Sequence, residues 1–442
     1  MALYQPPKSE ADFKANFAQK KPLMNDTEAF YESSRCLFCY DAPCMNACPT
    51  HIDVPLFIKQ INTGNVIGAA ETIFEANWLG NACGVVCPTT ELCEGSCVYD
   101  NQNVPVIQIG RLQNFATTKA MSQQAKLFAP GTPNGKNVAI IGAGPAGLAC
   151  ACELTTMGYT VDIYEAKSKP SGLTVYGIAP YKITNEEVLD EIAYLQNQLG
   201  FNIHYNKAIE TKGQLDDLEK NYDAIFLSVG IGPTRQLGLV GEDKDGVIGA
   251  VEFIEELRMR QHHISVPDKV VVIGGGNTAM DAASESAKMG AKQVSLVYRR
   301  GRESMGAYSF EYDYAISTGV DSVFNATPIQ ILGNGKVEGV KFIKTKVVDG
   351  KLANIKGSEF VIECGLVIKA TGQAKQGEFL SLIDGLELDR KNRITVDPQS
   401  YQSTNPNYFA GGDAVNGGAE VVNGAYEGKM AAQGIDRYLN KV

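Results

Sequence analysis

The cysteines carry the clearest chemical signal in this sequence, because eight of the eleven fall between positions 36 and 97. They form two sets, Cys36-x2-Cys39-x4-Cys44-x3-Cys48-Pro49 and Cys83-x3-Cys87-x5-Cys93-x3-Cys97. In a reducing compartment, so dense a group of cysteines favours metal binding over disulfide bonds. Thiolates are soft, strongly donating ligands, so iron and zinc are the metals to consider.

The spacing of the first set resembles the ferredoxin run, which ends in Cys-Pro and whose fourth cysteine ligates the other cluster of a pair. A short loop wraps three corners of a cubane, and the fourth ligand must come from elsewhere in the chain. A pair of four-cysteine zinc sites would need two or more short CxxC pairs, and only Cys36 and Cys39 form one. The pattern predicts two [4Fe-4S] clusters, with structural zinc and unligated cysteines as the alternatives.

A dinucleotide-binding fingerprint follows the apolar strand 137–141 and reads Gly142-Ala143-Gly144-Pro145-Ala146-Gly147. The first glycine permits the tight turn, the second lets a pyrophosphate approach the backbone, and the third lets the helix pack on the strand. The N-terminus of that helix attracts the pyrophosphate charge. Glu165 ends the next strand, where an acid can hold a ribose hydroxyl.

Two later segments strengthen the prediction of FAD, namely Ala370-Thr371-Gly372 and Phe409-Ala410-Gly411-Gly412-Asp413. The second resembles the far end of two-dinucleotide flavoproteins, in which an aspartate after paired glycines holds the ribityl chain. A helix beginning near Val421 is expected to direct its positive end at the flavin pyrimidine ring. Asp413 as a turn residue and Glu165 as a surface acid are the alternative. Leu173 and Gly412 complete the expected flavin contacts.

A second fingerprint reads Gly274-Gly275-Gly276-Asn277-Thr278-Ala279, and its following strand ends at Tyr298, directly before Arg299-Arg300. Gly274, Gly276, Asn277 and Thr278 are expected to hold a nicotinamide dinucleotide. An acid after that strand would favour a free 2′-hydroxyl, whereas arginines accommodate a 2′-phosphate. The arginine pair favours NADPH, and NADH with the arginines stacked on adenine or facing solvent is the alternative.

The reaction predicted from these motifs is hydride transfer from NAD(P)H to FAD, which needs no proton-transfer residue. No catalytic acid or base is therefore assigned, and no CxxC accompanies the second fingerprint, unlike in a disulfide reductase of the thioredoxin-reductase type. Cys150 and Cys152 fall on the helix after the flavin turn and are expected in the core.

The elements that position these motifs predict an α/β fold with a helical iron–sulfur domain at 1–125. Two β-α-β patterns follow, so two Rossmann-like domains are expected. The economical arrangement is an NAD(P) domain at 233–373 inserted into an FAD domain that comprises 126–232 and 374–442.

Charge and hydropathy limit the partners. A net charge of −10 argues against a nucleic-acid ligand, because no basic surplus exists to neutralise phosphates. Apolar runs are strand-sized and fall short of the roughly 18 residues of a membrane span. A cytoplasmic oxidoreductase is the expectation.

From about Cys36 onward the chain resembles the N-terminal half of dihydropyrimidine dehydrogenase, a separate subunit in bacteria, and is more distantly similar to the small subunit of glutamate synthase. The segment Ile109–Phe115 matches one that carries a glutamine cluster ligand in the dehydrogenases, at Gln113 here. The resemblance implies two ligand sets, with Cys83 left as a buried neighbour: Cys36, Cys39, Cys44 and Cys97; and Cys48, Cys87, Cys93 and Gln113. Gln113 as an ordinary helix residue is the alternative.

The sequence departs from the family at three points. Lys182 stands where the family has an arginine near the flavin. Gly306 stands where the single-chain enzymes, which use NADPH, have an arginine. The two-chain bacterial relatives use NADH. The FMN barrel and further clusters of the single-chain enzymes have no counterpart before Val442.

Three functions follow as hypotheses. The first is the electron-input subunit of a hetero-oligomer, whose FMN/iron–sulfur partner reduces uracil or thymine in pyrimidine metabolism. The second is a glutamate synthase small subunit or another ferredoxin-linked oxidoreductase. The third is a zinc-bound docking module beside a flavin-domain scaffold.

Overall fold

The computed structural model describes residues 3–102 and 104–440, and the chain divides into two compact units. The larger unit contains Gln19–Val175, Lys182–Ile231 and residues 375–440. The smaller unit contains residues 3–18, Tyr176–Tyr181 and Gly232–Ala374. The cysteine motifs and the first fingerprint belong to the larger unit, and the second fingerprint belongs to the smaller one.

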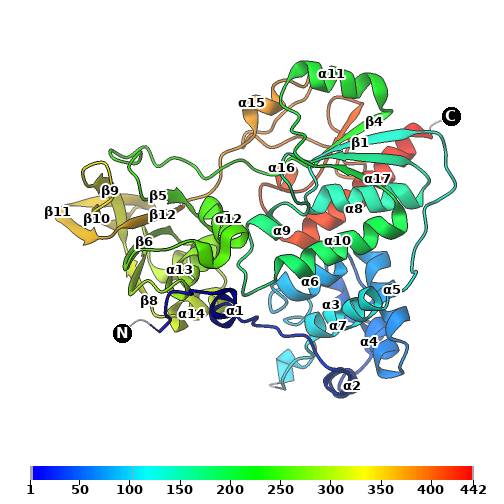
Figure 1. Cartoon of the computed structure of the whole chain (residues 1–442), viewed down its shortest axis with the longest axis horizontal. Helices are drawn as coiled ribbons and strands as arrows, with labels where there is room; N and C mark the ends of the chain where they lie inside the picture. Colours follow the sequence, from blue (N-terminus) through cyan, green and yellow to red (C-terminus); the bar gives the residue numbers. More distant parts are fainter. Residues whose placement is uncertain (1–2, 103, 441–442) are drawn as a thin grey trace. The chain divides into compact units, whose positions relative to one another are not determined.

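Short helices form the N-terminal part of the larger unit (Figure 1), and they are α2 (Asp26–Ser34), α3 (Pro43–Asn46), α4 (Val54–Asn62), α5 (Val66–Ala76), α6 (Gly80–Val86) and α7 (Ile109–Ser122). In α4, Val54, Phe57, Ile58 and Ile61 recur at helical spacing and are all buried. Asp53 caps this helix by accepting a hydrogen bond from the Leu56 amide at 3.0 Å. The apolar faces of these helices enclose one core around which the cysteine loops are folded.

A five-stranded parallel sheet forms the rest of the larger unit, in the order β13-β4-β1-β2-β3. Its strands are β1 (Asn137–Ile141), β2 (Thr160–Tyr164), β3 (Asn202–His204), β4 (Ala224–Leu227) and β13 (Tyr408–Ala410). Helices pack with it: α8 (Pro145–Thr156), α10 (Asn185–Leu199), α11 (Lys212–Asn221) and α17 (Val421–Leu439). The strand order reverses beside β1, and ligands of such sheets bind at the carboxyl ends of the strands at that point.

The smaller unit contains a second parallel sheet of the same kind, in the order β5-β12-β6-β7-β8. The strands are β5 (Val247–Gly249), β6 (Lys269–Gly274), β7 (Gln293–Tyr298), β8 (Val320–Phe324) and β12 (Leu366–Ala370). The helices of this unit are α1 (Glu10–Asn16), α12 (Ala250–Arg260), α13 (Asn277–Lys288) and α14 (Ser309–Ser317). Two Rossmann-like domains that follow a helical block along the chain confirm the predicted fold class.

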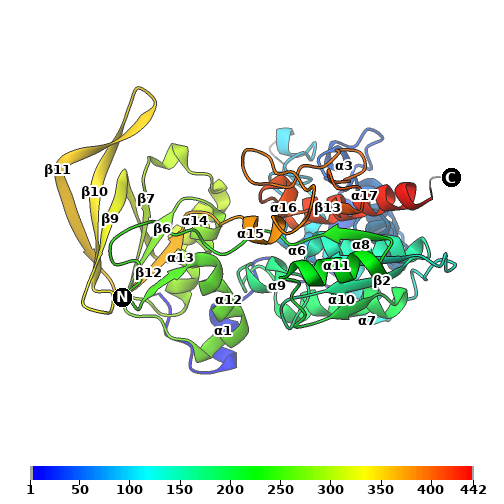
Figure 2. The same ribbon diagram turned by 90° about the horizontal axis from the view of Figure 1, so that it is seen from above.

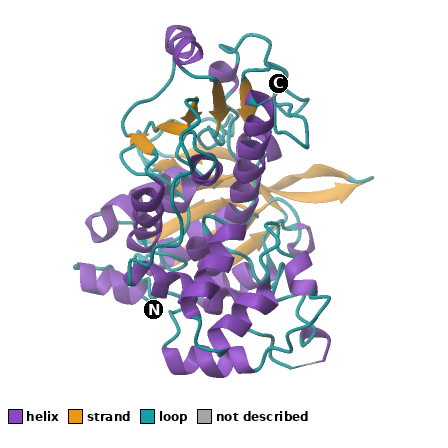
Figure 3. Cartoon of the chain, turned by 90° about the vertical axis from the view of Figure 1, so that its right-hand side faces the viewer, coloured by secondary structure: helices purple, strands orange, loops and turns teal. Residues whose placement is uncertain are grey.

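A three-stranded antiparallel sheet in the smaller unit was not predicted from the sequence. It is ordered β11-β10-β9 and consists of β9 (Ala326–Leu332), β10 (Gly339–Val348) and β11 (Lys351–Glu363). Figure 2 shows the β10–β11 hairpin continuing past the end of β9, and the same strands are the long orange arrows of Figure 3.

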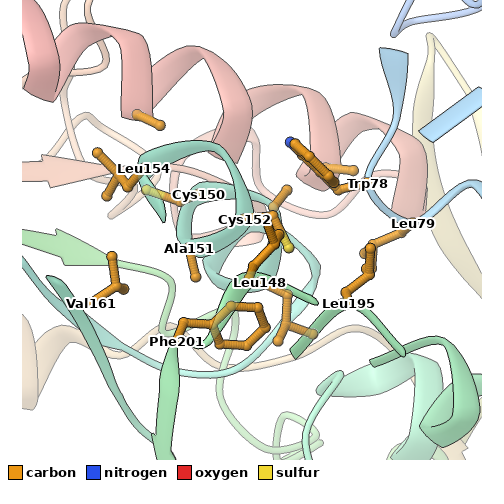
Figure 4. Close-up of a cluster of buried hydrophobic side chains, with 14 of the residues drawn as sticks. Trp78, Leu79, Leu148, Cys150, Ala151, Cys152, Leu154, Val161, Leu195 and Phe201 are labelled. Atoms are coloured by element: carbon orange, nitrogen blue, oxygen red, sulfur yellow. The ribbon is translucent and has the colours of Figure 1, made fainter. Parts of the chain in front are cut away.

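The helical block and the flavin-side sheet share one hydrophobic core within the larger unit. Figure 4 shows Trp78 and Leu79, from the segment before α6, beside side chains of α8 and α10. The Trp78 Nε1–H donates to Glu153 Oε2 at 2.9 Å, which satisfies both buried polar groups. Cys150 and Cys152 are fully buried in this core.

Candidate functional site

The first cysteine-lined hollow brings together Cys36, Cys39, Cys44 and Cys97, which come from the loop after α2, the start of α3 and a turn before α7. Apolar side chains form much of the rest of its wall: Leu37, Val54, Pro55, Ile58, Val98, Ile107 and Ile109. The arrangement places four thiol groups within a largely apolar lining. These are the four cysteines that the family resemblance groups together.

The second hollow is lined by Cys48, Cys87, Cys93 and Gln113, together with Cys83. Gln113 is 7% exposed on α7, and its Nε2–H donates to the carbonyl oxygen of Gly80 at 2.6 Å. That bond uses the amide nitrogen, so the side-chain oxygen is the Gln113 atom left to face a metal. Cys83 is 2% exposed and lines the same space, so five candidate ligands surround this hollow.

Burial sets the protonation of the cysteine thiols. It raises the pKa of Cys44 to about 11 and raises the pKa values of Cys36, Cys87 and Cys93; for Cys87 a hydrogen bond with Cys83 is the larger cause. Metal binding must therefore displace protons from these thiols. Among the described residues, no three Cys, His, Asp or Glu side chains are gathered as a group that could hold a single metal ion.

The first fingerprint turn has the shape that a dinucleotide pyrophosphate requires. Gly142 has φ +100°, and a Cβ atom there would lie 2.4 Å from the Ser228 carbonyl oxygen, so only glycine fits. A Cβ on Gly144 would meet only Ser228 atoms, at 3.6 Å and beyond. Gly144 precedes α8 and supplies no side-chain cap; Pro145 has no N–H and the Gly147 amide donates to Ser228 Oγ, so the Ala146 amide is the first-turn donor that an anion could use. These residues fit the phosphates of FAD.

The other expected flavin residues fall around this sheet edge. Glu165 is 8% exposed and accepts hydrogen bonds from the backbone amides of Ala143 and Lys167, each at 2.8 Å. Its carboxylate is therefore fixed beside the turn. Burial raises the pKa of Asp413, against the hydrogen bond that it accepts from the Ala419 amide. Leu173 is 38% exposed at the start of the short helix α9 (Leu173–Tyr176).

The far end of the predicted flavin site depends on Glu427, which the sequence did not suggest. Glu427, on α17, accepts a hydrogen bond from the Gly412 amide at 2.5 Å and one from Asn416 Nδ2 at 3.0 Å. Both bonds hold the turn that presents Asp413. Val421 begins α17, and its neighbour Val422 lines the second cysteine hollow. One helix N-terminus thus belongs to both the predicted flavin edge and the predicted cluster.

The second fingerprint turn, in the smaller unit, is likewise crowded at its first glycine and open at its third. A Cβ on Gly274 would lie 2.4 Å from the Ala370 carbonyl oxygen, whereas a Cβ on Gly276 would meet nothing within 4 Å. Gly276 begins α13 without a side-chain cap. Asn277 Oδ1 accepts from the Tyr308 amide at 3.0 Å, and Thr278 is exposed. The turn therefore has an open face suited to a dinucleotide phosphate.

The arginine pair follows the end of β7. Arg299 is exposed and Arg300 half-buried. The next arginine, Arg302, places its guanidinium 4.1 Å from the ring centre of Tyr312, where a cation–π contact holds it.

Ser228 and Glu191 are further functional candidates that sequence reasoning missed. Ser228 Oγ accepts from the Gly147 amide at 2.9 Å and so ties β4 to the flavin turn. Glu191 is fully buried on α10 and accepts from the amides of Asn81 and Ala82, at 2.6 and 3.2 Å. Neither had a local signal, because each acts on a turn far away in the sequence.

Glu191 should make the stability of the fold depend on pH. Burial raises its pKa to about 8, against the two amide hydrogen bonds, from an ordinary value of 4.5. Because the folded pKa lies above the unfolded one, unfolding releases a proton within this window, and stability falls as pH rises through it. We expect Glu191→Gln to flatten the decline of the melting temperature between pH 5 and 8. Glu186→Gln, on the exposed face of the same helix, is the control; parallel curves for wild type and Glu191→Gln would refute the assignment.

Comparison with known proteins agrees with this geometry. Residues 13–125 match the family model "dihydropyrimidine dehydrogenase domain II, 4Fe-4S cluster", and residues 136–428 match "pyridine nucleotide-disulphide oxidoreductase". Fold and site together define a NAD(P)-dependent flavin and iron–sulfur oxidoreductase that uses FAD and 4Fe-4S chemistry. The chain belongs to the pyridine nucleotide-disulphide oxidoreductase family, with the dihydropyrimidine dehydrogenase type of iron–sulfur domain preceding it.

Two curated relatives match nearly the whole chain. The glutamate synthase [NADPH] small chain of Escherichia coli (strain K12) is 35% identical, covering 98% of this chain and 96% of the relative. The NAD-dependent dihydropyrimidine dehydrogenase subunit PreT of the same organism is 36% identical, covering 95% and 96%. Identity alone does not separate these two relatives.

Solved structures agree on the fold. FprA of Mycobacterium tuberculosis in complex with NADPH gives a TM-score of 0.58 at 20% identity, over 69% of this chain and 84% of that one. Across the described residues, no helix has the length and apolar character that crossing a membrane requires.

Proposed function

We propose that this chain is the electron-input subunit of a dihydropyrimidine dehydrogenase. In this role it oxidises NAD(P)H and passes electrons to a separate FMN-containing subunit that reduces uracil or thymine to the 5,6-dihydropyrimidine, reversibly. When bound, FAD supplies the step from two-electron hydride chemistry to single electrons, and the iron–sulfur clusters carry those electrons onward. The curated relatives support the need for a partner, since they are named as a subunit and a small chain.

The protein residues have defined tasks in this proposal. The Ala146 amide and the amides after Gly276 bind phosphates, and the fixed carboxylate of Glu165 holds a ribose hydroxyl. The positive end of α17, at Val421, stabilises negative charge on the flavin pyrimidine ring. The chain's own groups orient the bound nucleotides and exclude water, and none of them transfers a proton.

Two ligand sets are proposed for the clusters. The first set is Cys36, Cys39, Cys44 and Cys97, and the second is Cys48, Cys87, Cys93 and Gln113. The two hollows support this division, because each is lined by one complete set. Val422 supports an order of electron transfer between the clusters. It lies in the wall of the second hollow, one residue from the predicted flavin contact Val421. Electrons would then enter at the second set and leave from the first.

Gln113 is the observation that favours a pyrimidine acceptor over glutamate synthase. Its hydrogen bond to Gly80 engages the amide nitrogen, which leaves the neutral amide oxygen as the candidate ligand that the resemblance to the dehydrogenases implies at this position. The 35% identity to the glutamate synthase small chain keeps that function as the second candidate.

The test is a reconstitution of the chain with each type of partner. With an FMN-barrel dehydrogenase subunit, we expect NAD(P)H oxidation that depends on added uracil. The matched control is the same mixture with 2-oxoglutarate and glutamine in place of uracil. Oxidation that depends on those substrates, only with a glutamate synthase large chain, would overturn the proposal and support the second candidate.

The arginine pair yields a separate prediction about the nucleotide. If Arg299 and Arg300 bind a 2′-phosphate, replacing both with alanine removes charge-assisted hydrogen bonds. We expect kcat/KM for NADPH to fall by at least about tenfold and that for NADH to change little. Steady-state rates with an artificial acceptor measure both. Lys292→Ala, whose ammonium pairs with Asp268 on the surface, is the control. Equal losses for both nucleotides would contradict the assignment.

A further inference from the structure

A half-buried cation, Lys21, lies against the lining of the second cysteine hollow. Its ammonium donates to the Cys87 carbonyl oxygen at 3.3 Å and to Thr89 Oγ1 at 3.1 Å. Cys87 and Thr89 both line the hollow, and Thr89 is 3% exposed. Lys21 precedes α2 in a segment without a motif, so only the fold brings its charge to this site.

A chain of hydrogen bonds holds this ammonium in place. The Thr89 hydroxyl donates to Glu94 Oε2 at 2.7 Å, and Glu94 Oε1 accepts from the Gly110 amide at 3.0 Å. Gly110 also lines the hollow, on the helix α7 that carries Gln113. The chain of bonds therefore joins three segments of the larger unit: the one before α2, the loop after α6, and the start of α7. A lysine bonded in this way keeps its charge at one place, unlike a mobile surface lysine.

The charge of Lys21 acts on a proposed cluster ligand. The hydrogen bond with Cys83 and burial are the main causes that raise the pKa of Cys87; the Lys21 ammonium opposes them, and the Glu420 carboxylate adds to them. A cation that favours a thiolate also favours the negative charge that a cluster gains when it is reduced. Proteins set the potentials of iron–sulfur clusters through such charge, through hydrogen bonds and through solvent exposure.

We propose that the Lys21 ammonium raises the reduction potential of the cluster held by the second ligand set, and so favours reduction of that cluster by the flavin. In that step the flavin loses one electron and the cluster gains one, and no bond in the protein forms or breaks. The inference rests on the proposed function and on its second ligand set. It adds a residue outside that set which acts through its charge.

Lys21→Met tests this inference in the full, cofactor-loaded chain without a partner. An equilibrium redox titration, followed by the electron paramagnetic resonance of each reduced cluster, measures both potentials. The signal that Cys87→Ala removes identifies the second cluster. At a fixed potential we expect Lys21→Met to lower the ratio of reduced to oxidised second cluster about tenfold, which is a fall of about 59 mV for a one-electron couple. The first cluster, in the same molecule, should keep its potential.

Three further variants separate the charge of Lys21 from its packing. Lys21→Arg keeps the positive charge and should restore most of the wild-type potential. Lys220→Met removes an exposed cation on α11 and should leave both clusters unchanged. Glu94→Gln removes the carboxylate that is bonded to Lys21 through Thr89, so the second cluster should become easier to reduce. This shift of opposite sign keeps the inference testable if Lys21→Met fails to hold iron.

An unchanged potential of the second cluster in either Lys21→Met or Glu94→Gln would overturn the inference. A fall in Lys21→Met that Lys21→Arg reproduces would also overturn it, because the effect would then belong to packing and not to charge. A wild-type chain that binds no iron, or whose flavin neither NADH nor NADPH reduces, would instead count against the proposed function. The two failures are therefore distinguishable.

Discussion

Replacing Cys87 with alanine is expected to halve the iron content of the chain, from about eight atoms to about four, because two cubane clusters hold four irons each. Cys87 lines the hollow that also contains Gln113, and removing one of four ligands leaves a cubane corner open to solvent. The chain should still bind FAD and reduce it with NAD(P)H, but should lose transfer to a one-electron acceptor. Iron and sulfide analysis, with the visible spectrum of the flavin, measures these effects.

Cys83→Ala is the matched control, because Cys83 lines the same hollow but lies outside the proposed ligand set. It should keep about eight irons, whereas Gln113→Ala should lose part of the second cluster. If Cys83→Ala loses iron and Gln113→Ala keeps it, the second cluster has four cysteine ligands, and the argument for a pyrimidine acceptor fails with it. Zinc in place of iron would support a docking module instead.

The parts of the fold that could be predicted from sequence are those in which the conformation of each residue is set by its neighbours along the chain. The strand at 137–141 has the predicted bounds, because a short apolar run next to a glycine turn has few other solutions. The turn at Gly142 could be predicted for the same reason, because its left-handed backbone favours glycine.

Features of the fold that depend on residues far apart in the sequence were not predicted. Glu191 reads as one acid among many on an amphipathic helix, and only the fold brings the amides of Asn81 and Ala82 to it. Residues 3–18, which fall in the predicted cysteine domain by position, group with the smaller unit, where Asn16 Nδ2 donates to the Lys288 carbonyl oxygen at 2.7 Å. Local pattern carries no information about such pairings, which are set by tertiary packing.

Gly144→Ala is expected to weaken FAD binding strongly while leaving the fold intact. The added methyl group would meet nothing in the protein closer than Ser228 Oγ at 3.6 Å, which is ordinary van der Waals contact. It would, however, occupy the space through which a pyrophosphate approaches the backbone amides of α8. The chain should purify without flavin absorbance and with its iron retained. Titration with FAD should show affinity lowered by at least about tenfold.

Two other glycine substitutions serve as controls, because they separate loss of FAD binding from loss of the fold. Gly142→Ala should unfold the domain instead, because its Cβ would lie 2.4 Å from the Ser228 carbonyl oxygen and its φ is +100°. Gly213→Ala, on α11 with nothing within 4 Å of the new Cβ, should keep both fold and flavin. Wild-type FAD affinity in Gly144→Ala would show that the pyrophosphate does not approach this turn. The first fingerprint would then be a structural glycine turn, and the flavin would have to bind elsewhere on the sheet.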